Sequence, residues 1–402
     1  MRYLISGYYG EGNGGDEALL AGIIQELRRR DPSSDITVLS FDPQDTVGRH
    51  QVESISTSLR HPEALVGAMR SSHLLISGGG SILHEADFAL HGRSFLLREG
   101  KLRPVPYFLS VVLLAQSLRL PVMWYAQGLG PLQTWQARRL VALAGSGCAA
   151  VTWRDPASAR LAYGVGVRAS IQSVVPDPAY ALAPRGSVRI RELMLAEGVR
   201  PDRRFMAVCP RPWLGRTRYV QRLAAALGRV ADTEVLDVVL IPFQQRTDGP
   251  LCAALAAHPA LAARASVLSG IEDAASLAGV LGQAAFAVTM RLHAGILAAA
   301  AGTPAVVLDY DPKVRAFAEQ TGQAAFAVSV DDLESAVGER ALEAAARATA
   351  RDLGARRAAL GRVVAPLREG AGRTARLAFQ LASHGGVPGM PARRGGGSGR
   401  GW

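Results

Sequence analysis

The feature that most constrains the fold of this 402-residue chain is a regular alternation of apolar, β-branched runs with segments of helical periodicity. In the first half, residues Glu17–Arg30 carry apolar side chains at helical spacing between two such runs. This rhythm is typical of a parallel sheet with helices on both faces. The strands predicted there are Tyr3–Ser6, Ile36–Phe41, Leu74–Ser77, Val122–Ala126, Ala149–Trp153 and Ile171–Val175.

A second set of the same kind follows a Pro-, Ala- and Gly-rich stretch over Pro176–Arg189, which reads as a linker. Its predicted strands are Phe205–Cys209, Val235–Ile241, Ser266–Leu268, Phe286–Thr289, Ala305–Leu308 and Ala325–Val328. We therefore expect an α/β fold of two similar Rossmann-type domains, residues 1–182 and 183–383, that face each other across a cleft. The second domain ends in an Ala/Arg-rich helical segment over Leu342–Ser383, and the composition of residues 384–402 predicts a disordered Gly/Arg-rich tail.

The net charge and the cysteine spacing limit which partners and metal sites we expect for this chain. The formal net charge of +11 favours anionic partners, such as a membrane surface or nucleic acid. No dense Lys/Arg run with interleaved aromatic residues is present, so we expect no nucleic-acid binding. The three cysteines are far apart and lack metal-ligand spacing, which predicts neither a disulfide framework nor a zinc site and suits a reducing cytoplasm.

The sequence predicts no targeting or membrane-spanning segment. The chain starts directly with a predicted strand, which indicates no signal peptide. The longest apolar region, Val105–Ala126, is interrupted by Pro106, Gln116, Arg119 and Pro121. That region predicts a buried helix followed by a strand.

An apolar run ends in Met290-Arg291-Leu292-His293, just before an Ala-rich helical pattern. This places a fixed cation and an imidazole in the first turn of a helix, where backbone N–H groups and the helix dipole favour an anion. Arg binds carboxylate or phosphate through two N–H groups, and His transfers protons near neutral pH. The segment therefore predicts a site for a small, highly charged anion. The alternative is a pair that caps a helix within the core.

Two more cations follow strands of the second half. Arg211 lies between two prolines and beside Trp213, so it loses little entropy on binding an anion; the alternative is a purely structural stack on Trp213. Lys313 follows the strand that ends near Leu308, and the alternative there is an ordinary solvated lysine. Loops at the carboxyl ends of parallel strands bind ligands in open α/β sheets, so we expect these cations to meet at one edge.

The N-terminal loop Gly7–Glu17 follows a strand and opens a helix. It contains G-x-G-x-x-G, and Asp42 ends the next strand, as in dinucleotide-binding folds. Asp16 and Glu17 would repel a pyrophosphate at the helix start, and with Asn13 they suit sugar hydroxyls better. Three interpretations stay open: hydroxyl binding, a tight turn with Asp16 as helix N-cap, and dinucleotide binding. Gln127, in a second Gly-rich loop, is a further candidate for hydrogen bonding to a ligand.

Taken together, the motifs resemble the polysaccharide pyruvyl transferase family, most closely its cell-surface-anchoring (CsaB-type) branch. They occur in family order over roughly residues 1–335. The matching pieces are Gly7–Ala18, Ile76–Ser81, Tyr125–Pro131, Arg154-Asp155, Pro176–Ala179, Arg211–Trp213, Met290–Gly295 and Tyr310–Lys313. The set as a whole is specific, although no single piece is.

The resemblance implies a GT-B-like fold and transfer of pyruvate from phosphoenolpyruvate to a sugar as a 4,6-ketal, with release of phosphate. It implies an acceptor sugar, N-acetylmannosamine, on a lipid-linked cell-wall polymer precursor at the cytoplasmic membrane face, in a pathway that anchors surface layers. By the family's motifs, Arg211 and Arg291 would hold phosphoenolpyruvate with a backbone contact from Leu292. His293 and Lys313 would be the catalytic pair, and the N-terminal domain would hold the acceptor.

The residues fit that chemistry. Phosphoenolpyruvate concentrates up to three negative charges on few atoms, which suits two arginines and a lysine at a helix N-terminus. His293 is the candidate general acid, Lys313 would neutralise the departing phosphate, and Asp16 or Glu17 would orient an acceptor hydroxyl. We expect no metal and no cofactor. The rival functions are a GT-B glycosyltransferase that uses a nucleotide sugar and a non-catalytic module that binds anionic membranes.

Overall fold

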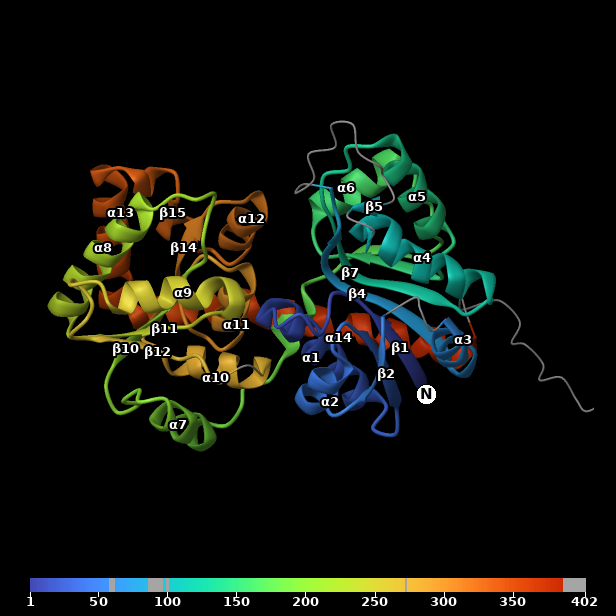
Figure 1. Ribbon diagram of the computed structural model, residues 1–402, viewed down its shortest axis with the longest axis horizontal. Helices are drawn as coiled ribbons and strands as arrows, with labels where there is room; N and C mark the ends of the chain where they lie inside the picture. Colours follow the sequence, from blue (N-terminus) through green and yellow to red (C-terminus); the bar gives the residue numbers. More distant parts are fainter. Residues whose placement is uncertain (58–61, 86–96, 99–100, 272, 386–402) are drawn as a thin grey trace, which may run out of the picture. The chain divides into compact units, whose positions relative to one another are not determined.

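The computed structural model describes residues 1–57, 62–85, 97–98, 101–271 and 273–385. By packing, the chain divides into two compact units (Figure 1). The first holds Met1–Gly10, Ile23–Asp177 and the chain from Gly372 onward, and the second holds Glu11–Gly22 and Pro178–Ala371. The short segment Glu11–Gly22 therefore packs with the second unit, although it precedes most of the first in sequence.

The first unit contains a parallel seven-stranded sheet in the order β3-β2-β1-β4-β7-β8-β9. Its strands are β1 (Arg2–Ser6), β2 (Asp35–Ser40), β3 (Glu53–Ser56), β4 (Leu74–Leu83), β7 (Val122–Leu129), β8 (Ala150–Trp153) and β9 (Gln172–Val174). A two-residue ladder joins β5 (Leu97–Arg98) to β6 (Lys101–Leu102). The central strand β7 is buried at every residue and β4 at every residue except Ser81, as expected for a sheet covered on both faces.

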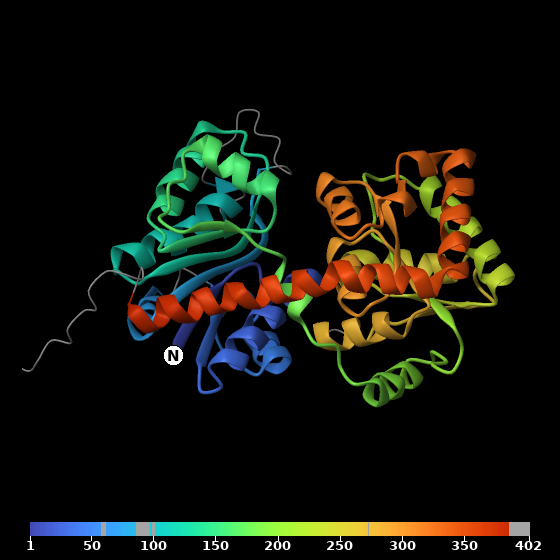
Figure 2. The same cartoon turned by 180° about the vertical axis from the view of Figure 1, so that it is seen from behind.

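Helices cover both faces of this sheet. One face carries α3 (Pro62–Ser71), α4 (Pro104–Ser117), α5 (Trp135–Ser146) and α6 (Pro156–Val165), packed on Trp124 and Trp153. The other carries the part of α1 (Gly14–Arg30) that starts at Ile23. The end of α14 (Leu353–His384), which is drawn in red in Figure 2, joins α1. Arg30 of α1 donates to the Gly372 carbonyl at 2.6 Å. A further helix, α2 (Pro43–His50), lies between β2 and β3.

The second unit contains a parallel six-stranded sheet in the order β12-β11-β10-β13-β14-β15. Its strands are β10 (Phe205–Cys209), β11 (Asp237–Leu240), β12 (Ala265–Val267), β13 (Phe286–Thr289), β14 (Ala305–Asp309) and β15 (Ala327–Ser329). Numbered from β10, the order is 3-2-1-4-5-6, that of a dinucleotide-binding Rossmann sheet. The strand order reverses between β10 and β13, so their carboxyl ends border the crevice where such sheets bind ligands.

Two apolar layers sandwich this second sheet. One layer packs around α8 (Arg218–Glu234), α9 (Gln245–Ala256) and α13 (Ala336–Arg351). The other packs around α7 (Ser187–Ala196), α10 (Ala274–Gln283), α11 (Leu292–Ala300) and α12 (Pro312–Gln320). Ala18 of α1 belongs to this second layer, which explains why the start of α1 packs with the second unit.

The expectation of two parallel-sheet Rossmann-like domains is confirmed. Each predicted strand overlaps an observed one, and Val105–Ala126 forms α4 and β7 as expected. No helix within the described ranges is long and apolar enough to cross a membrane. The predicted domain bounds remain a prediction. His384, the first residue of the predicted tail, is the last residue of α14, and residues 386–402 lie outside the described part of the chain.

Candidate functional site

The candidate site is built at the carboxyl ends of β10 and β13. The Met290 N–H donates to the Cys209 carbonyl at 3.0 Å, so the chain leaves these two strands from neighbouring positions. Arg211 lies two residues after the end of β10, and Arg291 lies two residues after the end of β13. Both predicted anion-binding arginines therefore start from the point where the strand order reverses.

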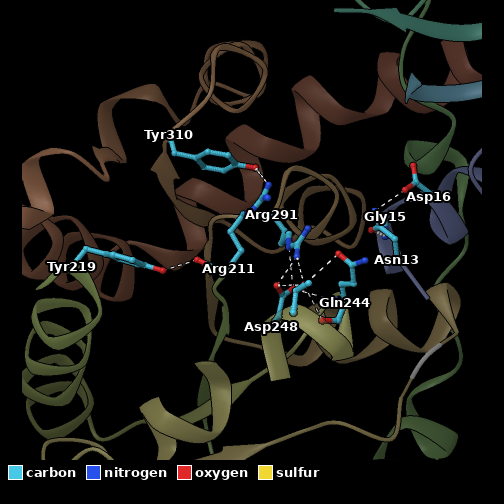
Figure 3. A network of polar contacts seen from close by, with 10 residues as sticks. Asn13, Gly15, Asp16, Arg211, Tyr219, Gln244, Asp248, Arg291 and Tyr310 are labelled. Carbon is cyan, nitrogen blue, oxygen red and sulfur yellow. Dashed lines mark hydrogen bonds and ion pairs between the residues drawn. The ribbon is translucent and has the colours of Figure 1, made fainter. Parts of the chain in front are cut away.

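Arg291 occupies the N-cap position of α11, and its side chain is held by a buried carboxylate. Its Nε donates to Oδ2 of Asp248 at 2.9 Å, and its Nη2 donates to Oδ1 at 2.5 Å (Figure 3). The Asp248 side chain is 0% exposed and that of Arg291 is 13% exposed. Nη2 also donates to the Thr247 hydroxyl at 3.1 Å. Bidentate geometry of this kind fixes the guanidinium plane.

The buried carboxylate of Asp248 accepts hydrogen bonds from several neighbours. Besides Arg291, it accepts the Gln244 N–H at 3.1 Å and the Thr247 hydroxyl at 3.1 Å. These bonds satisfy a carboxylate that would otherwise be costly to bury. The ion pair also places a negative charge directly beside Arg291. The Nη1 of Arg291 makes no hydrogen bond within the described ranges.

Arg211 has no carboxylate partner in the described part of the chain. Its Nη1 donates to the Tyr310 hydroxyl at 2.7 Å, and the guanidinium carbon lies 5.6 Å from the Trp213 ring centre and 5.1 Å from that of Tyr310. Its carbonyl accepts the Tyr219 hydroxyl at 2.5 Å. Its Nε is buried without a hydrogen-bond partner among the described residues. The stack on Trp213 exists, and it leaves the charge uncompensated.

Burial shapes the titration of groups beneath the site. It raises the pKa of Tyr219 to about 12, with Arg211 opposing the shift, so this hydroxyl stays protonated and keeps its bond to the Arg211 carbonyl. Burial also raises the pKa of Cys252 to about 12 and that of Cys209 well above its usual value. Neither thiol is a nucleophile at neutral pH, because the thiolate is the reactive form.

His293 is the second residue of α11 and packs against the N-terminal loop. A Cβ on Gly15 would overlap the imidazole Nδ1 and lie 3.0 Å from Cγ, so only glycine fits at this position. The loop is fastened nearby: the Gly14 N–H donates to the Phe243 carbonyl at 2.7 Å, and Asn13 pairs with Gln244 in an antiparallel bridge. The glycine motif thus serves close packing against the imidazole.

The predicted acceptor residues of this loop have different surroundings. Asn13 precedes α1, donates from Nδ2 to Asp16 at 2.6 Å and accepts the Gly15 N–H at 3.1 Å (Figure 3). Asp16 is half-buried, and Glu17 is buried. Because α1 begins at Gly14, Asp16 lies inside the helix, so the alternative that made it the N-cap is wrong. Asn13 sits at the helix start instead.

Lys313 lies in the first turn of α12, which follows β14, and β14 is the sheet neighbour of the strand β13 that leads to α11. Its ammonium is 3.4 Å from Oδ2 of Asp311 and its side chain is 39% exposed. The helices α11 and α12 pack closely at Gly295, where a Cβ would come within 2.6 Å of the Phe317 ring. An exposed pair of this kind is weak and exchanges readily.

Gln127 lies in the first unit and is completely buried. Its amide nitrogen donates to the carbonyls of Gly80 and Gly128 at 3.0 and 2.9 Å, which ties the ends of β4 and β7 together. Asp42 caps α2 through the Asp45 N–H at 3.1 Å. Its carboxylate therefore serves a local structural role, which weakens the dinucleotide interpretation of the loop.

Sequence reasoning missed Asp248, the partner that determines the environment of Arg291. It follows β11, and the strand-end rule that selected the arginines would also have selected this carboxylate. It missed the role of Tyr310 as well, although this residue lies in the segment that supplied Lys313. The roles assigned to the candidate residues remain predictions.

Comparisons with known proteins agree with this architecture. A family model described as polysaccharide pyruvyl transferase matches residues 13–312. A sequence search against curated proteins finds no significant match. The matched range includes Asn13, Arg211, Arg291 and His293, and it ends at the start of α12.

Solved structures of low sequence identity share the fold. UDP-GlcNAc 2-epimerase from Methanocaldococcus jannaschii superposes with a TM-score of 0.62 at 10% identity, covering 94% of this chain and 100% of that chain. The Neisseria meningitidis enzyme bound to UDP-GlcNAc gives 0.60 at 9% identity, with 94% and 99% covered. S. aureus MnaA in complex with UDP gives 0.58 at 11% identity, with 94% and 95% covered. The fold is therefore GT-B-like.

Proposed function

Because the chain belongs to the polysaccharide pyruvyl transferase family, we propose that it transfers pyruvate from phosphoenolpyruvate to a sugar as a 4,6-ketal. One observation carries the proposal: neighbouring strand ends of a single unit place Arg211, Arg291 and the start of α11 together. Phosphoenolpyruvate carries a carboxylate and a phosphate on a three-carbon frame. Two guanidinium groups and a helix N-terminus match both anionic ends.

In this proposal Arg211 carries most of the electrostatic attraction, because no carboxylate neutralises it. Arg291 contributes one amino group in a plane fixed by Asp248 and acts mainly as a positioned donor. The backbone N–H of Leu292, in the first turn of α11, supplies a further donor. Lys313 exchanges Asp311 for the departing phosphate, which its exposure permits.

His293 is the proposed general acid. It protonates the methylene carbon of the enol, which leaves an oxocarbenium-like centre at the adjacent carbon. One sugar hydroxyl adds to that carbon, the bond to phosphate breaks, and the second hydroxyl closes the ketal. One hydroxyl proton restores His293, and the other leaves with the phosphate. The packing of Gly15 on the imidazole supports this role, because it limits the positions that the ring can take.

On the acceptor side, we assign Asp16 to orient a hydroxyl in preference to Glu17, because Asp16 is the less buried carboxylate. Asn13 holds it through the 2.6 Å hydrogen bond, and Gln127 is assigned a supporting role in the first unit. The proposed acceptor is N-acetylmannosamine of a lipid-linked cell-wall precursor, as in the cell-surface-anchoring branch. The reaction then takes place at the cytoplasmic membrane face.

The test is incubation of the purified chain with phosphoenolpyruvate and a synthetic N-acetylmannosamine-terminated lipid disaccharide. We expect release of phosphate and an acceptor that gains one carboxyethylidene group by mass, with NMR giving the ketal position. His293→Ala should abolish phosphate release and leave the fold intact. His258→Ala is the matched control, because this imidazole follows the far end of α9 and should leave turnover unchanged. Full turnover by His293→Ala removes it from the mechanism.

The rival function is transfer from a nucleotide sugar, and it needs a direct comparison because two of the structural neighbours are bound to UDP and to UDP-GlcNAc. Asp248 follows the second strand of the sheet, where a ribose-binding carboxylate would be expected, but Arg291 already occupies it. Thermal-shift titration separates the two functions. Stabilisation by phosphoenolpyruvate supports our proposal, and stabilisation by UDP or GDP sugars alone contradicts it.

A further inference from the structure

Two neighbouring helices of the first unit expose large apolar side chains to solvent. Trp135 and Leu143 on α5 are 68% and 64% exposed, and Tyr163 on α6 is 70% exposed. The two helices pack against each other and lie on the same face of the sheet, between β7 and β9 (Figure 1). Their outer sides therefore form one surface.

The exposed apolar residues on α5 do not contribute to the packing of this helix on the core. The inner side of α5 already presents Ala137, Val141 and Ala144 to the core, so the helix does not need Trp135 or Leu143 to pack. The start of α5 is secured separately by Glu85, which accepts the Gln133 and Thr134 N–H groups at 2.7 and 2.9 Å. A rigid, exposed tryptophan on such a platform marks an interaction surface.

The same surface is basic, and α5 and α6 themselves carry no carboxylate. Four arginines belong to it: Arg138, Arg139, Arg160 and Arg168. Residues 104–168 contain a single acidic side chain, Asp155, and it caps α6 through the Ser158 N–H at 2.7 Å. None of the four arginines forms an ion pair with a residue that the structure describes. We call these arginines together with Trp135, Leu143 and Tyr163 the α5–α6 face.

In the second unit, partly exposed arginines on one helix are paired with carboxylates of a neighbouring helix. On α8, Arg222 and Arg229 both pair with Glu339 of α13, and Arg229 also pairs with Glu343. On the α5–α6 face the counter-charge is missing. Arg168 lies over the Tyr163 ring instead, 4.4 Å from its centre, which joins a cation to an aromatic surface.

We propose that the α5–α6 face docks on a lipid bilayer that contains anionic headgroups. Aromatic and aliphatic side chains that alternate with arginines suit the interface, where the rings enter the headgroup layer and the guanidinium groups meet phosphates. Charge selects this occupant over a second copy of the chain. A symmetric contact through this face would set arginines against arginines without a carboxylate to separate them.

The α5–α6 face would be the surface by which the proposed enzyme reaches a lipid-linked acceptor, so its biological role rests on the proposed function. Its test uses neither phosphoenolpyruvate nor acceptor. Failure of vesicle binding therefore leaves the pyruvyl transfer assay unaffected, and failure of that assay leaves vesicle binding unaffected.

The experiment is co-sedimentation of the full chain with phosphatidylcholine vesicles, with and without phosphatidylglycerol. We expect binding only to the anionic vesicles. Arg138→Ser/Arg139→Ser should weaken it by about 25-fold, because each arginine near an anionic surface contributes about 1 kcal/mol, roughly fivefold in affinity. Trp135→Ser/Leu143→Ser should weaken it at least tenfold. The matched control is Val188→Ser/Leu195→Ser, which removes equally exposed apolar side chains from α7 and should change nothing.

Trp135 also reports on its own environment. Of the five tryptophans, Trp124 and Trp153 are buried. In a chain that carries Trp213→Phe/Trp402→Phe, a blue shift of tryptophan emission on anionic vesicles should therefore come from Trp135, and it should disappear when Trp135→Phe is added while binding remains. Three results overturn the proposal. The first is equal binding to vesicles with and without phosphatidylglycerol. The second is binding that is lost when the arginines at 393, 394 and 400 are replaced by serine but is kept in Arg138→Ser/Arg139→Ser. The third is conversion of a dimer to a monomer by Trp135→Ser/Leu143→Ser.

Discussion

Arg211 and Arg291 follow neighbouring strands of one sheet, yet their environments are opposite. Arg291 is held by two hydrogen bonds to a fully buried Asp248, whereas Arg211 lies against two aromatic rings, and its buried Nε has no hydrogen-bond partner among the described residues. The first arrangement fixes the guanidinium plane beside a negative charge, and the second holds the guanidinium group without a carboxylate from the described part of the chain. The difference teaches that equivalent strand ends can hold arginines in opposite environments; in the proposed site, Arg291 would position the anion and Arg211 would attract it.

The largest effect should come from Asp248→Ala. Removing one partner of a buried ion pair leaves an uncompensated charge, and such changes typically cost about 3–5 kcal/mol of unfolding free energy. Urea denaturation measures it. Asp331→Ala, which removes the exposed partner of Arg216, is the control and should stay within about 0.5 kcal/mol of the parent. A similarly small loss in both variants would mean that Asp248 does not hold Arg291 in solution.

The second effect concerns ligand affinity. Arg211→Ala should raise the phosphoenolpyruvate dissociation constant by about 10- to 100-fold, because hydrogen bonds to charged groups contribute about 1.5–3 kcal/mol. Its unfolding free energy should change far less than that of Asp248→Ala. Arg211→Lys keeps the charge but loses the planar fork, so its affinity should fall in between. Titration calorimetry decides the matter, and an unchanged affinity in Arg211→Ala would reverse the assignment of the two arginines.

A third prediction tests positioning without touching either arginine. Gly15→Ala inserts a methyl group against the His293 ring, which should lower kcat by about tenfold through misplacement of the imidazole, with phosphoenolpyruvate affinity unchanged. Gly361→Ala is the matched control, because a Cβ there meets nothing within 4 Å on the exposed side of α14. Steady-state kinetics separates the two. Equal kcat values would show that the ring position does not depend on this packing.

The smallest effect should come from Tyr310→Phe. It removes one neutral hydrogen bond to Arg211 Nη1 and keeps the ring, so phosphoenolpyruvate affinity should fall by about fivefold, corresponding to about 1 kcal/mol. The same calorimetric titration measures it. A loss as large as that in Arg211→Ala would place the hydroxyl on the ligand itself.

The sequence predicted the sheets well because buried parallel strands are continuous apolar runs, as in Phe205–Cys209 and Phe286–Thr289. It missed β3, Glu53–Ser56, because an edge strand needs no apolar run and three of the four residues of this one are polar. The start of α1 at Gly14 was also missed, since glycines favour turns in a sequence pattern. Packing on Phe243 and His293 overrides that preference.

For the site, strand-end reasoning selected Arg211, Arg291 and His293 and brought them to neighbouring positions. It could not show that Arg291 is neutralised by Asp248, because the two residues are 43 positions apart and meet only through β11 and β13. Nor could it assign the N-terminal loop to the second unit. That depends on the Gly14–Phe243 and Asn13–Gln244 contacts, which have no local signal.

The most direct measurement is an experimental structure of the chain with phosphoenolpyruvate. We expect the anion to contact Arg211 and Nη1 of Arg291, to accept a hydrogen bond from the Leu292 N–H, and to turn its methylene carbon toward His293. A ligand that lies elsewhere, or that contacts neither arginine at the ends of β10 and β13, would contradict the proposed phosphoenolpyruvate site.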